Sequence, residues 1–175
     1  MIAGIILSDN KQLNSEIALL DEELEVHSFE TNEELVNKIT EAEPDIIAVN
    51  SAGEITREDL SEEEENLKEE GYSFTPSRTE SKKIKRLQSL KAVLHREMVD
   101  SPEFIRFDPH ISSKELEIDN DEALKGYGLN VSDINSARQF DAVLGSITAR
   151  FYEQEQFQDL GVIVPKSLDS EEPEE

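Results

Sequence analysis

Residues 1–10, MIAGIILSDN, open with an apolar run and end with Ser-Asp-Asn. A short apolar run closed by turn-forming residues predicts a strand that is buried on both faces. SEIALLD (15–21) predicts a second strand, and the alternation in LEVHSFE (24–30) predicts a third strand that is partly exposed. The DEE between them fits a hairpin turn, so the chain begins with three successive strands.

A helix and a fourth strand complete the first fifty residues. Thr31 or Asn32 can cap a helix over 32–43, which Pro44 closes. DIIAVN (45–50) follows as an apolar strand. The resulting order is strand, strand, strand, helix, strand, which predicts an α/β domain.

The middle of the chain changes character. Residues 57–71, REDLSEEEENLKEEG, are helix-prone but carry little apolar surface, so we expect a loosely packed helical insertion or lid at about residues 53–81. Apolar residues then recur at steps of three or four through residues 80–98, which predicts an amphipathic helix. The whole pattern predicts one domain over 1–165 and an acidic, disordered tail over 166–175.

The last third supplies the remaining elements. The expected order is a strand over 103–110 that ends at Pro109, short helices within 112–118 and 119–129, a long helix over 136–156 and a short strand at 161–165. No internal repeat interrupts this order.

The formal net charge of the chain is −24, from 41 acidic and 17 basic residues. This charge disfavours nucleic acid as a partner, because that affinity comes largely from Lys and Arg contacts to phosphates. Adaptation to a high-salt cytoplasm and an ordinary well-solvated surface both explain the acidity. The chain has no cysteine, no apolar run near the ~20 residues that span a bilayer, and no basic leader. We therefore expect a cytoplasmic protein without membrane contact.

Several short motifs resemble, in order, a predicted-nuclease family of the ribonuclease H-like fold, the domain-of-unknown-function four-two-nine family. GIILS partly matches its Gly-Ile-Asp start, IAVNSAG its fourth strand, FIRFDPH its fifth strand and RQFDAVLGSITARFYE its Lys/Arg-x-x-Asp-Ala helix. The similarity covers roughly residues 1–165. It implies an α/β fold with a central mixed five-stranded sheet, three antiparallel strands followed by parallel strands, flanked by helices.

The resemblance also implies where a metal site would lie. Catalysis in this fold uses several carboxylates to hold one or two divalent ions near the scissile phosphate. The family's carboxylate positions fall on Ile6, Asn50 and Arg106, none of which is an anion. Only Asp141 matches. These vestigial positions predict a catalytically inactive binding or scaffold protein with no cofactor.

A rebuilt site is the alternative prediction. Asp108 lies two residues beyond Arg106, so on a continuing strand it faces the same side and approaches Asp141. Asp9 follows the first strand, and Asp9, Asp108 and Asp141 are then the candidate metal ligands of a divergent nuclease that uses Mg²⁺ or Mn²⁺. Asp108 and Asp141 would be its catalytic residues, acting on nucleic-acid phosphodiesters. A different hypothesis pairs Arg106 with Asp141, so that a salt bridge replaces the metal.

The one basic concentration is RTESKKIKRLQSLKAVLHR (78–96). Its candidate contacts to nucleic acid are Lys82, Lys83, Lys85 and Arg86. The competing interpretation is the solvated face of an amphipathic helix. A protein partner is the other expectation, and a weaker hypothesis has the acidic surface mimic nucleic acid.

Overall fold

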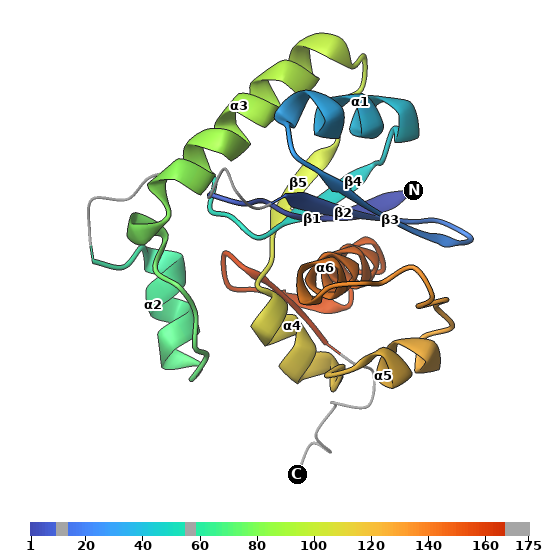
Figure 1. The fold of residues 1–175 in the computed structure, drawn as a ribbon. Coiled ribbons are helices and arrows are strands. Elements are labelled where there is room, and N and C mark those ends of the chain that lie inside the picture. The colour runs from blue at the N-terminus through green and yellow to red at the C-terminus, as the bar shows by residue number, and fades with distance from the viewer. Residues whose placement is uncertain (10–13, 55–58, 167–175) are drawn as a thin grey trace.

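The computed structural model describes residues 1–9, 14–54 and 59–166, so the predicted tail, apart from Lys166, lies outside the described residues. Its main feature is a five-stranded sheet in the order β3-β2-β1-β4-β5 (Figure 1). The strands are β1 (Ile2–Ile6), β2 (Ser15–Leu20), β3 (Leu24–Phe29), β4 (Ile46–Val49) and β5 (Glu103–Arg106). Strands β3, β2 and β1 pair antiparallel, whereas β1, β4 and β5 pair parallel. The predicted mixed sheet is therefore confirmed.

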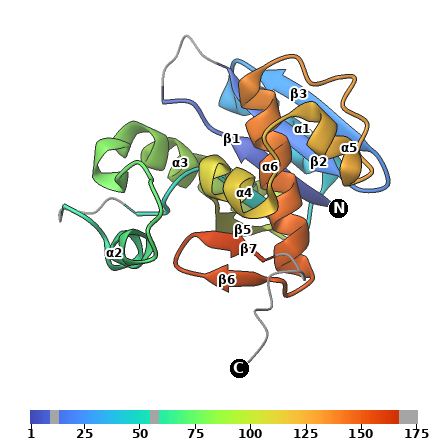
Figure 2. The same cartoon turned by 90° about the horizontal axis from the view of Figure 1, so that it is seen from below.

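Helices cover both faces of this sheet. The helices of the described residues are α1 (Asn32–Ala42), α2 (Glu62–Glu69), α3 (Ser81–Glu97), α4 (Pro109–Leu116), α5 (Asp121–Gly126) and α6 (Ala137–Glu153), with a short 3₁₀ turn η1 (Ser77–Thr79). Helices α1 and α3 lie on one face, and α6, α4 and α5 lie on the other (Figures 1 and 2). Within the described residues, no helix is long and apolar enough to cross a membrane.

Two hydrophobic cores lie on opposite faces of the sheet, because successive side chains of a strand point to opposite faces. Ile5 and Ile47 point toward α1 and α3 and join one core. Ile6, Ala48 and Phe107 belong to the other core, on the side of α6. All five residues of β1 are buried, as its continuous apolar run predicts.

Helix α6 lies unusually close to β1. A Cβ atom added at Gly4 would come within 2.0 Å of the Ala142 carbonyl oxygen, and one added at Gly145 within 2.7 Å of the Phe107 ring. Two glycines therefore set the distance between the last helix and the central strand.

The strand predicted over 103–110 is too long. Strand β5 ends at Arg106, and Asp108 is the N-cap of α4, which begins at Pro109. Proline at the first helical position fits a helix start because its missing N–H needs no partner there. The prediction that Asp108 continues the strand is wrong for this reason.

The short strand predicted at 161–165 exists, but it lies outside the main sheet. Strand β7 (Ile163–Pro165) pairs antiparallel with β6 (Phe157–Asp159), which sequence analysis missed. The hairpin helps to anchor α2, because Leu67 clusters with Val162 and Val164 from β7 and its turn. Leu67 and Glu64 are both fully buried, whereas the other residues of α2 are exposed. The loosely packed insertion or lid stays a prediction.

Candidate functional site

The carboxyl ends of three parallel strands meet at one edge of the sheet. Strand β1 pairs parallel with β4, and β4 pairs parallel with β5, so the residues that follow these strands lie side by side. In open α/β sheets, this edge is the usual place for a ligand. The positions that the resemblance assigns to a metal site all fall near it.

Ile6 and Asn50 occupy the ends of β1 and β4. Ile6 is 2% exposed, belongs to the core beside α6, and has no atom that can bind a metal. The Asn50 side-chain oxygen accepts a hydrogen bond of 2.8 Å from the Leu7 amide. Asn50 therefore ties the ends of the two strands together.

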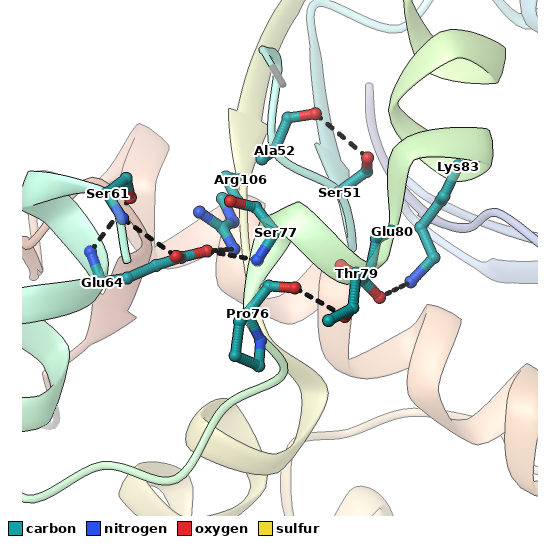
Figure 3. Close-up of polar contacts among 10 residues, drawn as sticks. All are labelled: Ser51, Ala52, Ser61, Glu64, Pro76, Ser77, Thr79, Glu80, Lys83 and Arg106. Carbon is teal, nitrogen blue, oxygen red and sulfur yellow. Dashed lines mark hydrogen bonds and ion pairs between the residues drawn. The ribbon is translucent and has the colours of Figure 1, made fainter. Parts of the chain in front are cut away.

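Arg106 leaves the sheet on the opposite face from Ile6. Its register partner Val49 belongs to the core beside α1 and α3, whereas the preceding Ile105 belongs to the core beside α6. The Arg106 guanidinium pairs with Glu64 of α2 at 3.3 Å (Figure 3). The hypothesis that Arg106 forms a salt bridge with Asp141 is therefore wrong, because the partner of Arg106 is Glu64.

Glu64 is a fully buried carboxylate that sequence analysis missed. It accepts hydrogen bonds from the Ser77 amide at 2.6 Å, the Ser61 amide at 3.1 Å and Arg106 (Figure 3). Burial alone would raise the pKa of Glu64, but the hydrogen bonds from Ser77 and Ser61 and the charge of Arg106 outweigh it and lower the pKa. The available signal was the Ser-x-x-Glu capping box at 61–64, hidden in a run of four glutamates.

A pocket of about 170 Å³ lies at this strand edge and is walled by several elements. Its polar lining includes Asn50, Lys83, Arg106 and Asp108. Lys83 is ion-paired with Glu80, and each side chain is at most 15% exposed. The pocket thus contains charges of both signs that already have partners.

Asp108 and Asp141 are the two candidate carboxylates that the structure brings near each other. One Asp108 oxygen caps α4, accepting from the amides of His110 at 2.9 Å and Ile111 at 3.1 Å. Burial raises the pKa of Asp141, Arg138 lowers it, and the negative charge of Asp108 raises it further. Asp9 is exposed beyond β1. In the described part of the chain, no group of three or more His, Cys, Asp or Glu residues is arranged to hold a metal ion.

A second buried carboxylate, Glu16, lies opposite Ile6 in the β1–β2 register. It is 5% exposed and accepts a short hydrogen bond from the Ser28 hydroxyl, which itself accepts one from Gln139 of α6. The sequence pattern predicts only a strand for this stretch. Glu16 connects β2, β3 and α6 on the same face as Ile6.

The four basic candidates on α3 divide into two pairs. Lys82 and Lys85 are exposed, whereas Lys83 and Arg86 are only partly exposed. Lys83 faces the pocket, and Arg86 donates to the Ser8 carbonyl at 2.8 Å. Of these four residues, Lys82 and Lys85 are the ones whose side chains are exposed.

Comparison with known proteins identifies the fold. No protein-family model matches the chain, and no curated protein matches it. Among solved structures, it is similar to Thermus thermophilus RuvC in complex with a Holliday junction substrate, with a TM-score of 0.58, 12% identity, and coverage of 94% of this chain and 98% of that chain. The Thermus thermophilus RuvC structure is also similar, with a TM-score of 0.47 at the same identity and coverage. At 12% identity the likeness shows the fold alone, an α/β ribonuclease H-like fold.

Proposed function

We propose that this protein is a catalytically inactive member of the ribonuclease H-like nuclease folds, and that it acts as a binding or scaffold protein. The observation that carries the proposal is the chemistry at the ends of β1, β4 and β5. Ile6 is an apolar core residue, Asn50 bridges two strands, and Arg106 is a cation neutralised by Glu64. None of these three residues supplies the negative charge that a divalent ion needs.

The fold family implies one or two Mg²⁺ or Mn²⁺ ions, and the described residues do not fit a two-metal site. Asp108 and Asp141 are two carboxylates, but Asp108 already caps α4 through one oxygen. The other oxygen donors that line the pocket include the neutral amide of Asn50 and the carboxylate of Glu80, which is already ion-paired with Lys83. Mg²⁺ is commonly bound through one or two carboxylates together with substrate oxygens and water, so this set is sparse for two ions.

The test is isothermal titration of the purified protein with MnCl₂ at high salt, beside an Asp141→Asn control. We expect no saturable binding in the micromolar range for either protein. Micromolar binding that Asp141→Asn abolishes would overturn the proposal. Such a result would call for a screen of nucleic-acid substrates.

A divergent nuclease is the second candidate function, and one observation favours it. The mutual repulsion of Asp108 and Asp141 is the charge arrangement that a bound cation relieves. Under this alternative, Mn²⁺ would support cleavage of a nucleic-acid phosphodiester, and Asp108→Asn would abolish cleavage. Fluorescent oligonucleotides with and without Mn²⁺ provide the assay.

The partner of the inactive protein is proposed to be a protein or a small molecule. The net charge of −24 repels an extended polyanion. RuvC itself is seen with a Holliday junction, which makes nucleic acid the competing partner class.

A further inference from the structure

Two arginines from opposite faces of the sheet meet at the connection between β1 and β2. Arg86 comes from α3 and donates to the Ser8 carbonyl at 2.8 Å, while Arg138 comes from α6 and donates to the Asn14 carbonyl at 3.1 Å. Ser8 and Asn14 lie on the two adjoining strand ends, because the Ser8 amide contacts the Ser15 hydroxyl at 3.4 Å. The two guanidinium groups therefore lie near the same strand edge as the pocket.

These arginines lack the carboxylate partners that other cations near this edge possess. Arg106 pairs with Glu64, and Lys83 pairs with Glu80. Within the described residues, neither Arg86 nor Arg138 has a carboxylate oxygen within the 4.0 Å of an ion pair. Arg138 still lies near enough to Asp141 to lower the pKa of that carboxyl, so its charge is compensated only at a distance longer than an ion pair.

The charges of the two arginines are close enough to repel. Burial lowers the pKa of Arg86, and the positive charge of Arg138 lowers it further. The Arg138 Nε is also buried without a hydrogen-bond partner in the described structure. The Arg86 Nε already donates to the Asn32 side-chain oxygen at 2.5 Å, so a shared anion would be bound by the N–H groups that this contact and the two carbonyl contacts do not use. Guanidinium N–H groups donate charge-assisted hydrogen bonds to a phosphate or carboxylate.

We propose that Arg86 and Arg138 form a binding site for a compact phosphate oxyanion, such as the phosphate group of a small phosphorylated molecule. The net charge of −24 repels a long polyanion, but a single phosphate gains two close guanidinium contacts at short range. The inference deepens the proposed binding role and rests on it, because it gives that role a ligand class.

The test is calorimetric titration with inorganic phosphate in the presence of EDTA. We expect saturable binding to the wild-type protein, and binding at least about tenfold weaker to Arg138→Gln, because a hydrogen bond to a charged group is lost. Arg96→Gln is the matched control, since Arg96 is an exposed arginine of α3 that pairs only with its neighbour Glu97. Its affinity for phosphate should equal that of the wild type.

Arg138→Lys keeps the charge but removes the planar fork, so we expect an intermediate affinity. It also provides a second variant if Arg138→Gln unfolds, as judged by circular dichroism. No saturable phosphate binding by the folded wild-type protein would overturn the proposal. Equal binding by wild type and Arg138→Gln would also overturn it, and the arginines would then serve only to hold the strand ends.

Two competitors identify the source of the phosphate. Displacement of phosphate by O-phosphoserine supports a small phosphorylated ligand. Stronger, salt-sensitive displacement by a single-stranded oligonucleotide supports the oxyanion site but assigns the phosphate to nucleic acid. Because EDTA removes divalent ions, this result is independent of the Mn²⁺ titration, and either proposal can fail while the other stands.

Discussion

At the scale of single residues, the Glu64 carboxylate accepts hydrogen bonds from three donors at once. Its carboxylate joins α2, η1 and the end of β5, and it is fully buried. Removing one member of a buried ion pair leaves the other charge without compensation, which costs more than the pair itself contributes. Removing Arg106 should cost less than removing Glu64, because the Glu64 carboxylate would still accept hydrogen bonds from two backbone amides.

We therefore predict that Glu64→Ala lowers the free energy of unfolding by about 3–5 kcal/mol, and that Arg106→Met lowers it by less. Urea unfolding followed by circular dichroism measures both. Glu65→Gln is the control at an exposed neighbour and should change stability by less than about 0.5 kcal/mol. Equal losses for Glu64→Ala and Glu65→Gln would contradict this view of the buried carboxylate.

For Asp141, in contrast to Glu64, we predict that removing the charge raises the free energy of unfolding. Burial and the nearby Asp108 raise its pKa in the folded protein, so the folded state holds the proton more tightly than the unfolded chain. Stability from this group is then present at low pH and is lost as the pH rises from the ordinary value of 3.8 through the raised pKa.

Asp141→Asn should accordingly be more stable than the wild type at pH 7, and this gain should vanish below about pH 4. The measurement is urea unfolding at a series of pH values. If Asp141→Asn is less stable than the wild type at neutral pH in EDTA, Arg138 stabilises the ionised carboxylate by more than burial and Asp108 destabilise it.

Arg106→Glu tests the face on which this residue lies. The substitution would place two carboxylates together, beside Glu64 and on the face away from Ile6. We predict a loss of stability and no Mn²⁺ binding that depends on Asp141, both measurable in one thermal-unfolding series with and without MnCl₂. A rise in the melting temperature on adding Mn²⁺ that Asp141→Asn abolishes would place residue 106 beside Asp141.

At the scale of elements, the contact of β1 with α6 depends on a missing side chain. Gly4→Ala would put a Cβ atom within 2.0–2.7 Å of three backbone atoms of α6, which cannot be relieved by a side-chain rotation. The helix would have to shift, and overpacking of this kind typically costs about 1–3 kcal/mol or more. The whole α6 side of the core would be disturbed.

We predict a loss of at least about 3 kcal/mol for Gly4→Ala and a small gain for Gly126→Ala. Gly126 ends α5, and a Cβ atom there meets nothing within 4 Å. Denaturant unfolding compares the two glycine substitutions directly. A tolerated Gly4→Ala would mean that α6 does not lie as close to β1 as the structure has it.

At the scale of the whole molecule, charge dominates. A net charge of −24 on 175 residues destabilises the compact state through self-repulsion, and added salt screens that repulsion. We predict that the melting temperature rises steeply from 0.05 M to 2 M KCl. Sucrose at equal osmolality is the control, because it is excluded from the protein surface but does not screen charge. A melting temperature that does not change with KCl would contradict the high-salt explanation of the acidity.

Much of the fold was predictable because its main strands and helices have long hydrophobic patterns. The apolar runs of β1 and β4 and the stripe of α3 identified their elements, and their order identified the sheet. The three-residue β6 has too little pattern to be seen, since its existence depends on pairing with β7.

The candidate site was less predictable, because it depends on register and chain direction. The face of the sheet on which the Arg106 side chain lies depends on its register partner in β4. The position of Asp108 depends on the residue at which β5 ends. Glu64 and Arg138 are single charged residues whose importance comes from partners distant in sequence. A sequence pattern of neighbouring residues contains none of this information.

The contact of Gly4 with α6 has a consequence for the order of biosynthesis. The central strand is made first, but the helix that covers one of its faces begins at Ala137. On the ribosome, at about 5–20 residues per second, the apolar face of β1 waits several seconds for its cover. The nascent chain therefore exposes the apolar face of β1 until α6 emerges, and chaperones that shield such surfaces should associate with it during that interval.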